Sequence, residues 1–436
     1  MGAGGSRDAR RVAFRVLRAC TRGQRLDRAL DTRARALAPR DRHWVHALAY
    51  GAARLRGRLD YIIARHARRG LERLDPEVLD LLRMGVYQLH HMEGVPSYAA
   101  VSSTVELARA TGAGRAAGLI NAVLRAAARA GSPADAFPTP ATDLEGYLTH
   151  RHSHPRWLVR RWLARWGRSD TEALVRHDNG VPGLFLRPVG IEAEPARERL
   201  RAAGMTATEA GLGCGCLRLA AGTDPARALQ AVPGVIQDPG AALVARYAAP
   251  PPGAVVADVC AAPGGKALAL SEQAGYVVAA DLSLPRLKLV TASASRLRTR
   301  VGAVVADAGS VPVRRADLVL VDVPCSGTGT LARRPDARWR LTGKDPARLA
   351  RVQSRLLAGA SRAIPPGGLL VYSTCTLEPE ENDEVVEGFL SRHPEFRLEA
   401  PGDMNPQVLD DRGQLRVLPQ HTGFDGAFAA RMRRAP

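Results

Sequence analysis

From residue 254 onward, apolar runs of strand length alternate with helical segments. The strand-like runs are Ala254–Val259, Tyr276–Ala280, Val301–Ala306, Asp317–Val323 and Leu369–Ser373. Helical patterns such as Pro285–Arg300 and Pro346–Ile364 lie between them. A chain that alternates in this way forms a parallel sheet with helices on both faces. We therefore predict a doubly wound α/β domain over residues 236–436.

The first 131 residues follow a helical period instead. Apolar residues recur at steps of three and four, as in Ala9, Val12, Ala13, Val16, Leu17 and Cys20. Asp75 followed by Pro76 predicts an N-cap and the first residue of a further helix. This region holds 24 arginines against 11 acidic residues, so it carries +13 of the net charge of +19. An all-α, basic domain is expected over residues 1–131.

Two segments join these regions. Pro133, Pro138 and Pro140 predict a linker over residues 132–150, and a mixed α+β segment is expected over residues 151–235. Its first part has an apolar stripe with arginines between the stripe positions: Leu158, Val159, Trp162, Leu163 and Trp166. We interpret this stripe as a helix core, in preference to a surface that stacks RNA bases.

The overall charge favours a polyanionic partner. The chain has 62 basic and 43 acidic residues and a pI near 10.7, which points to nucleic acid. Six scattered cysteines fit a reducing cytoplasm, and Cys214 and Cys216 have no second pair with which to form a metal site. The start of the chain has no secretory pattern, and no apolar run approaches 18 residues, so we expect neither export nor a membrane span.

The first chemical motif lies where a strand passes into a helix. It runs from Asp258 to Lys266 and contains Cys260, Ala261, Ala262, Pro263, Gly264 and Gly265. Ligands of doubly wound sheets bind at such positions, and the paired glycines allow close approach of the backbone. Asp281 and Asp307 end the next two strands. Three carboxylates along one crevice predict a site for an adenosine-type cofactor.

The second group brings two thiols to the ends of two later strands. It comprises Asp322-Val-Pro-Cys325-Ser-Gly and Ser373-Thr-Cys375. A buried cysteine alone is more often inert core, but two thiols at one sheet edge favour nucleophilic chemistry. An acid such as Asp322 could orient the nitrogen of a heterocycle.

Together these motifs make the chain resemble the RNA 5-methylcytosine methyltransferases of the RsmB or Sun type. Pro96–Ala108 and Gly118–Arg125 resemble the NusB-like domain of that family. The resemblance implies a NusB-like RNA-binding domain, a small intervening α+β segment and a Rossmann-like class I methyltransferase domain. It also implies an S-adenosylmethionine-dependent enzyme that methylates C5 of a cytosine in 16S rRNA, free or partly assembled, with cytosine 967 as the expected target.

The resemblance also assigns roles to residues. Residues 260–266 would bind S-adenosylmethionine together with Asp258, Asp281 on the ribose, Arg286, Asp307 on the adenine side and Asp322. Cys375 would be the nucleophile, Asp322 would hold the N3/N4 edge of the base, Cys325 would promote release, and Lys266 would complete the catalytic set. No metal is implied.

Two departures and two alternatives remain. Arg187-Pro188-Val189 stands where relatives carry an Arg-x-Asn element, which puts that RNA contact in doubt, and Asp425-Gly-Ala-Phe428 replaces Asp-Gly-Phe-Phe. The same chemistry could act on another rRNA or tRNA cytosine. A NusB-like RNA-binding or antitermination factor without catalysis is the second alternative, and retention of both thiols argues against it.

Overall fold

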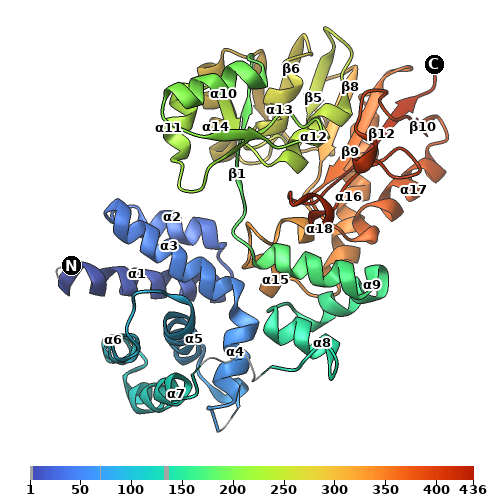
Figure 1. The fold of residues 1–436 in the computed structure, drawn as a ribbon. Helices are drawn as coiled ribbons and strands as arrows, with labels where there is room; N and C mark the ends of the chain where they lie inside the picture. The colour runs from blue at the N-terminus through green and yellow to red at the C-terminus, as the bar shows by residue number, and fades with distance from the viewer. Residues whose placement is uncertain (1–2, 69, 132–136) are drawn as a thin grey trace. The chain divides into compact units, whose positions relative to one another are not determined.

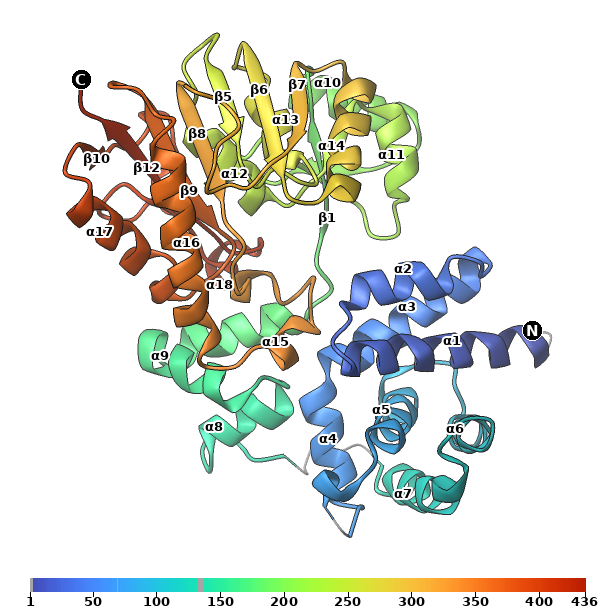
Figure 2. The ribbon, with the colours of Figure 1, turned by 180° about the vertical axis from the view of Figure 1, so that it is seen from behind.

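The computed structural model describes residues 3–68, 70–131 and 137–436, so the stretch 132–136 of the expected linker lies outside the described residues. The chain forms two units. The first, here called the helical unit, contains Met1–Gly180 and Leu331–Gly343. The second, the sheet unit, contains Val181–Thr330 and Lys344–Pro436. Figures 1 and 2 show the ribbon from opposite sides.

The helical unit is built from amphipathic helices around one apolar core. Its helices up to residue 131 are α1(Ala3–Thr21), α2(Leu26–Ala34), α3(Pro39–Arg54), α4(Arg56–Ala64), α5(Pro76–His91), α6(Ser97–Arg109) and α7(Ala117–Arg129), with short 3-10 turns η1(Leu71–Arg73) and η2(Gly114–Ala116). The predicted start at Pro76 is confirmed, although the Asp75 side chain makes no capping hydrogen bond. Val78, Leu82 and Val86 of α5 are buried, as their helical spacing predicts.

Beyond residue 136 the helical unit continues through three further helices and a π-helical turn. These elements are α8(Leu144–Gly146), the turn η4(Tyr147–Arg151), α9(Arg156–Asn179) and, much later in the chain, α15(Ala337–Arg340). The predicted apolar stripe lies on α9, and Trp162 is fully buried there, which confirms the core interpretation. Gly167, with a φ of 70° and a ψ of −168°, divides α9 into two helical segments at a kink.

The sheet unit begins with a small antiparallel sheet in the order β2-β3-β1-β4. Its elements are β1(Leu184–Pro188), α10(Ala193–Ala202), β2(Ala207–Glu209), β3(Leu217–Leu219), α11(Pro225–Ala231) and β4(Gly234–Ile236). Leu186, Leu217 and Leu219 pack with residues of α10 and α11 in a core of their own. The later part of the segment expected over residues 151–235 is therefore a four-stranded α+β layer, whereas residues 151–180 belong to the helical unit.

The large sheet has the order β10-β12-β9-β8-β5-β6-β7, with β11 paired to β12. Its elements are α12(Pro239–Ala248), β5(Val255–Asp258), α13(Gly265–Leu270), β6(Tyr276–Asp281), α14(Leu284–Leu297), β7(Val301–Val305), β8(Leu318–Asp322), η5(Thr328–Thr330), α16(Asp345–Ser361), β9(Leu369–Thr374), η6(Pro379–Glu381), α17(Asp383–Arg392), β10(Phe396–Leu398), η7(Pro406–Val408), β11(Leu415–Val417), α18(Pro419–Thr422) and β12(Ala427–Arg434). The five predicted strands are confirmed as the parallel part, β5 to β9.

Both faces of the parallel strands are covered, which explains their nearly continuous apolar sequence. Leu318 and Leu320 of β8 face the core shared with α12 and α14, while Val319 and Val321 face α16 and α17. All five strands point the same way, so their carboxyl ends meet at one edge of the sheet. This edge is where the polar motifs lie.

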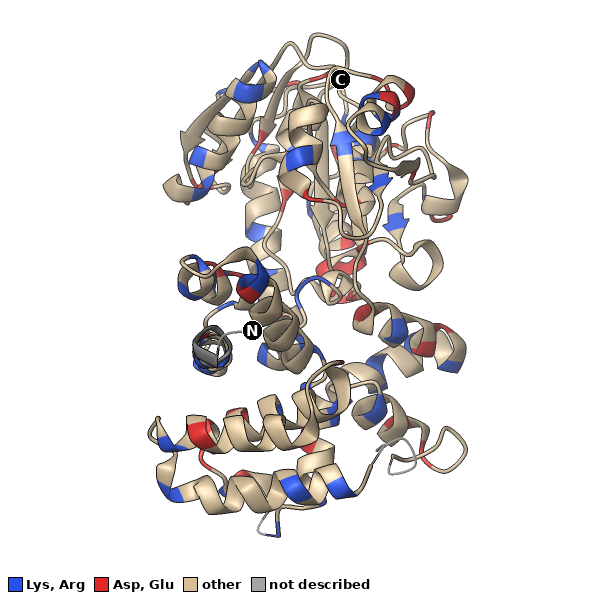
Figure 3. Cartoon of the chain, turned by 60° about the vertical axis from the view of Figure 1, so that its left-hand side comes forward, with Lys and Arg blue, Asp and Glu red and all other residues tan. Residues whose placement is uncertain are grey.

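Basic residues are spread along the helices, as the blue segments of Figure 3 show. The helical unit has 35 arginines and 18 acidic residues, whereas the sheet unit has 27 basic and 25 acidic residues. None of the helices in the described part of the chain is long and apolar enough to cross a membrane.

Candidate active site

Two cysteines meet at the carboxyl ends of neighbouring strands. β8 and β9 are parallel with Asp322 opposite Ser373, so the loops that follow them start side by side. The Cys325 and Cys375 sulfurs are 3.4 Å apart, and the Cys375 backbone N–H points to the Cys325 sulfur at 3.4 Å. Both side chains are half-buried. The structure thus brings together the two thiols that the sequence placed at one edge.

Glycines allow the two loops to approach each other. The Gly329 N–H donates to the Cys375 carbonyl at 3.1 Å, and a Cβ atom at Gly329 would lie only 2.9 Å from the same oxygen. Gly327 has a φ of +67°, which favours glycine. The small residues after Cys325 are therefore needed for the thiols to meet.

The close contact between the two sulfurs affects the proton of the Cys325 thiol. The contact with Cys375, together with burial, raises the pKa of Cys325 well above its ordinary value. Only one proton is needed to bridge the two sulfurs, because either sulfur can act as the donor.

Lys266 supplies a positive charge beside this pair. Its Nζ lies 2.7 Å from Asp322 Oδ2, and Ser373 Oγ donates to Asp322 Oδ1 at 2.8 Å. Burial opposes the charged ammonium, but the charge and hydrogen bond of Asp322, with smaller contributions from Asp258 and Cys375, raise the pKa of Lys266. The raised pKa favours the charged form of Lys266 beside Asp322.

Asp258, the last residue of β5, is almost completely buried. Neither of its carboxylate oxygens has a hydrogen-bond partner among the described residues. Burial, and then the charge of Asp322, raise the pKa of Asp258 to about 7. A buried carboxyl group without a partner needs a ligand to complete it, because an unpaired buried polar group costs about 1–3 kcal/mol.

Asp281, the last residue of β6, holds the neighbouring loop. Its oxygens accept from the backbone N–H groups of Ala262 at 3.2 Å and Ser283 at 2.9 Å. Arg286 pairs with the same carboxylate at 3.2 Å and also donates to the Ala262 carbonyl. Asp281 and Arg286 therefore hold the turn at Ala262, a structural role that the sequence analysis did not predict.

The glycines of that turn allow it to pack closely against neighbouring residues. Gly264 has a φ of +110°, and a Cβ atom on Gly265 would meet the Gln237 amide at 2.9 Å. Gln237 in turn accepts from Arg187 Nε at 2.8 Å, and Arg187 forms an ion pair with Glu272 at 2.6 Å. Arg187, the first residue of the Arg187-Pro188-Val189 stretch in which Val189 replaces the expected Asn, is thus buried and linked to the turn through Gln237.

Two further predicted residues are Asp307 and Cys260. Asp307 follows the end of β7, is exposed, and accepts from the Gly309 N–H at 2.8 Å. Cys260 lies on the turn itself, and burial raises the pKa of its thiol.

A buried acid behind the thiols was missed by the sequence analysis. Glu381 accepts from the Ser326 N–H at 2.9 Å and from Gln353 Nε2 at 2.8 Å, and it also bonds the Ser326 hydroxyl. Its backbone carbonyl accepts from the Tyr372 hydroxyl at 2.6 Å. Glu381 thereby ties the Cys325 loop to β9 and α16. The signal was available in Pro379-Glu-Glu-Asn382, an acidic pair close after the nucleophile motif.

Family models match almost the whole chain. The NusB family matches residues 7–129, a ferredoxin-like domain of the RsmF/B-like methyltransferases matches residues 154–225, and the 16S rRNA methyltransferase RsmB/F model matches residues 245–433. The probable ribosomal RNA small subunit methyltransferase B of Synechocystis is 34% identical, over 98% of this chain and 99% of that protein. Ribosomal RNA small subunit methyltransferase B of Thermus thermophilus is 35% identical, over 98% and 97%.

Solved structures support the fold. The structure of PH0851 matches with a TM-score of 0.80 and 22% identity, over 98% of this chain and 99% of that one. NSun6 from Pyrococcus horikoshii, solved with SFG, matches with a TM-score of 0.56 and 19% identity, over 66% of this chain and all of that one. With its family models and its full-length relatives, the chain belongs to the RsmB/F family of 16S rRNA methyltransferases.

Proposed function

We propose that this protein transfers a methyl group from S-adenosylmethionine to C5 of a cytosine in 16S rRNA, with Cys375 as the nucleophile. The observation that carries the proposal is the thiol pair of Cys325 and Cys375, 3.4 Å apart and next to the Lys266–Asp322 ion pair. We further propose cytosine 967 as the target, on the strength of the family resemblance alone.

The residues at the strand ends fit S-adenosylmethionine. Asp258 offers a buried carboxyl group that lacks a partner among the described residues, suited to a cationic amino group. Asp281 offers carboxylate oxygens for ribose hydroxyls, and Leu282 beside it is 71% exposed and gives an apolar surface. When bound, S-adenosylmethionine supplies an electrophilic methyl group.

Cytosine C5 is a weak nucleophile, so the protein must activate it. In our proposal the Cys375 thiolate forms a bond to C6, and the electrons of the C5–C6 double bond move to C5, which takes the methyl group. Loss of the C5 proton then restores the double bond and breaks the bond between C6 and sulfur. We assign Asp322 to the N3/N4 edge of the base and Cys325 to proton loss and release.

The target base has to leave any stack in order to reach half-buried thiols. Single-stranded or locally opened RNA is therefore the expected substrate, as in free or partly assembled small subunits. The proposed chemistry also needs two reduced thiols, and all six cysteines are free. This supports our expectation that the enzyme works in a reducing compartment.

Denaturing gels with labelled RNA test the two thiols. Cys375→Ala should lose methylation by more than about 10⁴-fold and form no adduct, because the covalent step cannot begin. Cys325→Ala should attack and methylate but stall as a protein–RNA adduct that survives denaturation. An adduct with Cys375→Ala and none with Cys325→Ala would reverse the two assignments, while an adduct with neither variant would contradict covalent catalysis.

Bisulfite sequencing of rRNA with and without the enzyme tests the target. A new protected cytosine at position 967 is the expected result. Protection elsewhere would keep the chemistry and overturn the target.

A further inference from the structure

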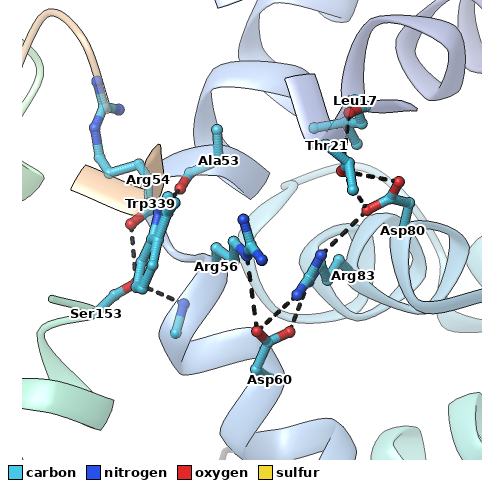
Figure 4. A network of polar contacts seen from close by, with 11 residues as sticks. Leu17, Thr21, Ala53, Arg54, Arg56, Asp60, Asp80, Arg83, Ser153 and Trp339 are labelled. Atoms are coloured by element: carbon cyan, nitrogen blue, oxygen red, sulfur yellow. Dashed lines mark hydrogen bonds and ion pairs between the residues drawn. The ribbon is translucent and has the colours of Figure 1, made fainter. Parts of the chain in front are cut away.

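The segment Leu331–Gly343 follows the loop of Cys325 in the sequence but packs in the helical unit. Its Trp339 Nε1–H donates to the Ala53 carbonyl at 2.8 Å, and the Arg56 guanidinium lies 5.6 Å from the Trp339 ring centroid. Figure 4 shows Trp339 beside the end of α3, close to Ser153. Part of the methyltransferase sequence is thus built into the NusB-like side of the molecule.

Arg338 anchors this segment. Its side chain is completely buried, and its guanidinium donates to the Ser153 carbonyl at 3.1 Å, the Asn179 side-chain oxygen at 2.9 Å and the Asp178 carbonyl at 3.0 Å. Several hydrogen bonds from one planar group fix its orientation. The residues on either side of Arg338 are therefore held in one position.

The anchored segment closes a small basic pocket. The pocket has a volume of about 160 Å³, and it is lined by three residues from the region of the first helices and by four residues of the anchored segment. Four arginines line it together with Tyr50: Arg25, Arg333, Arg334 and Arg340. All of these residues belong to the helical unit.

Two acids also line the pocket, and both have partners. Asp27 accepts from Arg25 Nε at 3.2 Å. Asp336 accepts from Arg340 at 2.9 Å and from the Leu26 N–H at 3.3 Å. Because four arginines stand against two acids, the pocket keeps a net positive charge, and the Arg334 side chain is exposed.

We propose that this pocket binds a backbone phosphate of the RNA substrate, an inference that rests on the proposed rRNA methylation. Guanidinium groups bind phosphate through paired hydrogen bonds, and the helical unit carries +17 of the net charge of +19. Arg334 lies only nine positions after Cys325, and nine extended residues span roughly 30 Å at most.

Arg334→Ala in the full-length protein tests the pocket, with Arg115→Ala as the matched control. Arg115 is another exposed arginine of the helical unit, outside this pocket. Binding of an unmodified 16S rRNA fragment is measured over a range of salt concentrations. We expect Arg334→Ala to weaken RNA binding by about three- to tenfold and to lower the slope of log affinity against log salt by about one. The affinity for S-adenosylmethionine and the kcat at saturating RNA should stay unchanged, and only KM for RNA should rise.

Each other outcome has a defined meaning. If Arg334→Ala has the affinity and salt slope of Arg115→Ala, the pocket is not a phosphate site. Weaker binding with an unchanged salt slope would equally overturn the proposal, because no phosphate contact would have been lost. If the unmodified protein fails to bind the fragment, the proposed function fails, which is distinct from failure of the pocket alone.

Discussion

The helical unit and the sheet unit differ most in how they use charge. The helical unit has a surplus of 17 positive charges, whereas the sheet unit has a surplus of only two. In the sheet unit the important charges are paired at short range, as in Lys266 with Asp322. Long-range attraction of RNA and short-range chemistry are therefore expected to depend on different units, so a change in one should leave the function of the other intact.

Removal of the Arg338 guanidinium is expected to have the largest effect, and it tests whether a change in the helical unit leaves the sheet unit intact. Arg338→Met leaves the buried carbonyls of Ser153 and Asp178 without this donor and removes the cation with the largest effect on the buried Asp178 carboxyl, which should destabilise the helical unit by about 3–5 kcal/mol. All five tryptophans lie in the helical unit, so urea unfolding followed by tryptophan fluorescence reports on it.

S-adenosylmethionine affinity, a property of the sheet unit, should be unchanged in Arg338→Met. Arg115→Met serves as the exposed control and should unfold like the unmodified protein. If Arg338→Met lost S-adenosylmethionine affinity as well as stability, the two units would be shown to unfold together. The expected independence of the helical unit and the sheet unit would then be wrong.

The second test addresses Glu381 in the sheet unit. Glu381→Ala leaves the Ser326 N–H and the Gln353 amide without this acceptor in a buried site, at a cost of about 2–3 kcal/mol. Because this network positions the loop of Cys325, methylation should slow about 100-fold or more. Glu387→Ala, which changes an exposed acid on α17, is the control and should methylate normally. Unfolding reported by the tryptophans should not change, and a shift in that transition would contradict the prediction.

The third test is Asp281→Asn. Loss of one charged acceptor should weaken S-adenosylmethionine binding by about 10- to 100-fold, measured by calorimetric titration. RNA affinity and its salt dependence should remain as in the unmodified protein. Unchanged cofactor affinity together with lost RNA binding would refute the placement of Asp281 on the ribose.

The smallest expected effect concerns pH. Because burial raises the pKa of Asp258 to about 7, the carboxyl group is neutral below that pH and loses its attraction for a cationic group. S-adenosylmethionine affinity should therefore rise roughly eightfold from pH 6 to pH 7.5. Asp258→Asn should bind more weakly and without this pH dependence. An affinity that falls as the pH rises would mean that the protonated carboxyl is the binding form.

The sequence anticipated the parallel sheet and the ends of its strands with some precision. Strand-length apolar runs mark buried strands whatever they pack against, and Asp258, Asp281 and Asp322 each end one of them. The meeting of Cys325 with Cys375 followed from strand ends sharing one edge. The local sequence pattern was sufficient to predict this part of the fold, because short connections between parallel strands allow few other sheet topologies.

The path of residues 331–343 could not be predicted in this way. Periodicity shows which face of a segment is buried, but it does not identify a distant partner. Arg338 is a charged residue in a short, arginine-rich stretch whose composition is typical of exposed chain, yet its partners at positions 153, 178 and 179 bury it. Glu381 was missed for the same reason, since a charged residue is buried only when tertiary contacts satisfy it.

The route of the chain has a practical consequence for protein engineering. It passes between the units three times, after Gly180, Thr330 and Gly343. No single cut therefore yields both units whole, and a truncated protein that ends at residue 180 would lack the tryptophan and arginine of α15. A domain exchange between relatives would therefore have to include residues 331–343 together with residues 1–180. Otherwise the exchanged helical unit would lack the segment that contains Arg338 and Trp339, and the residues that normally bind this segment would be left without it.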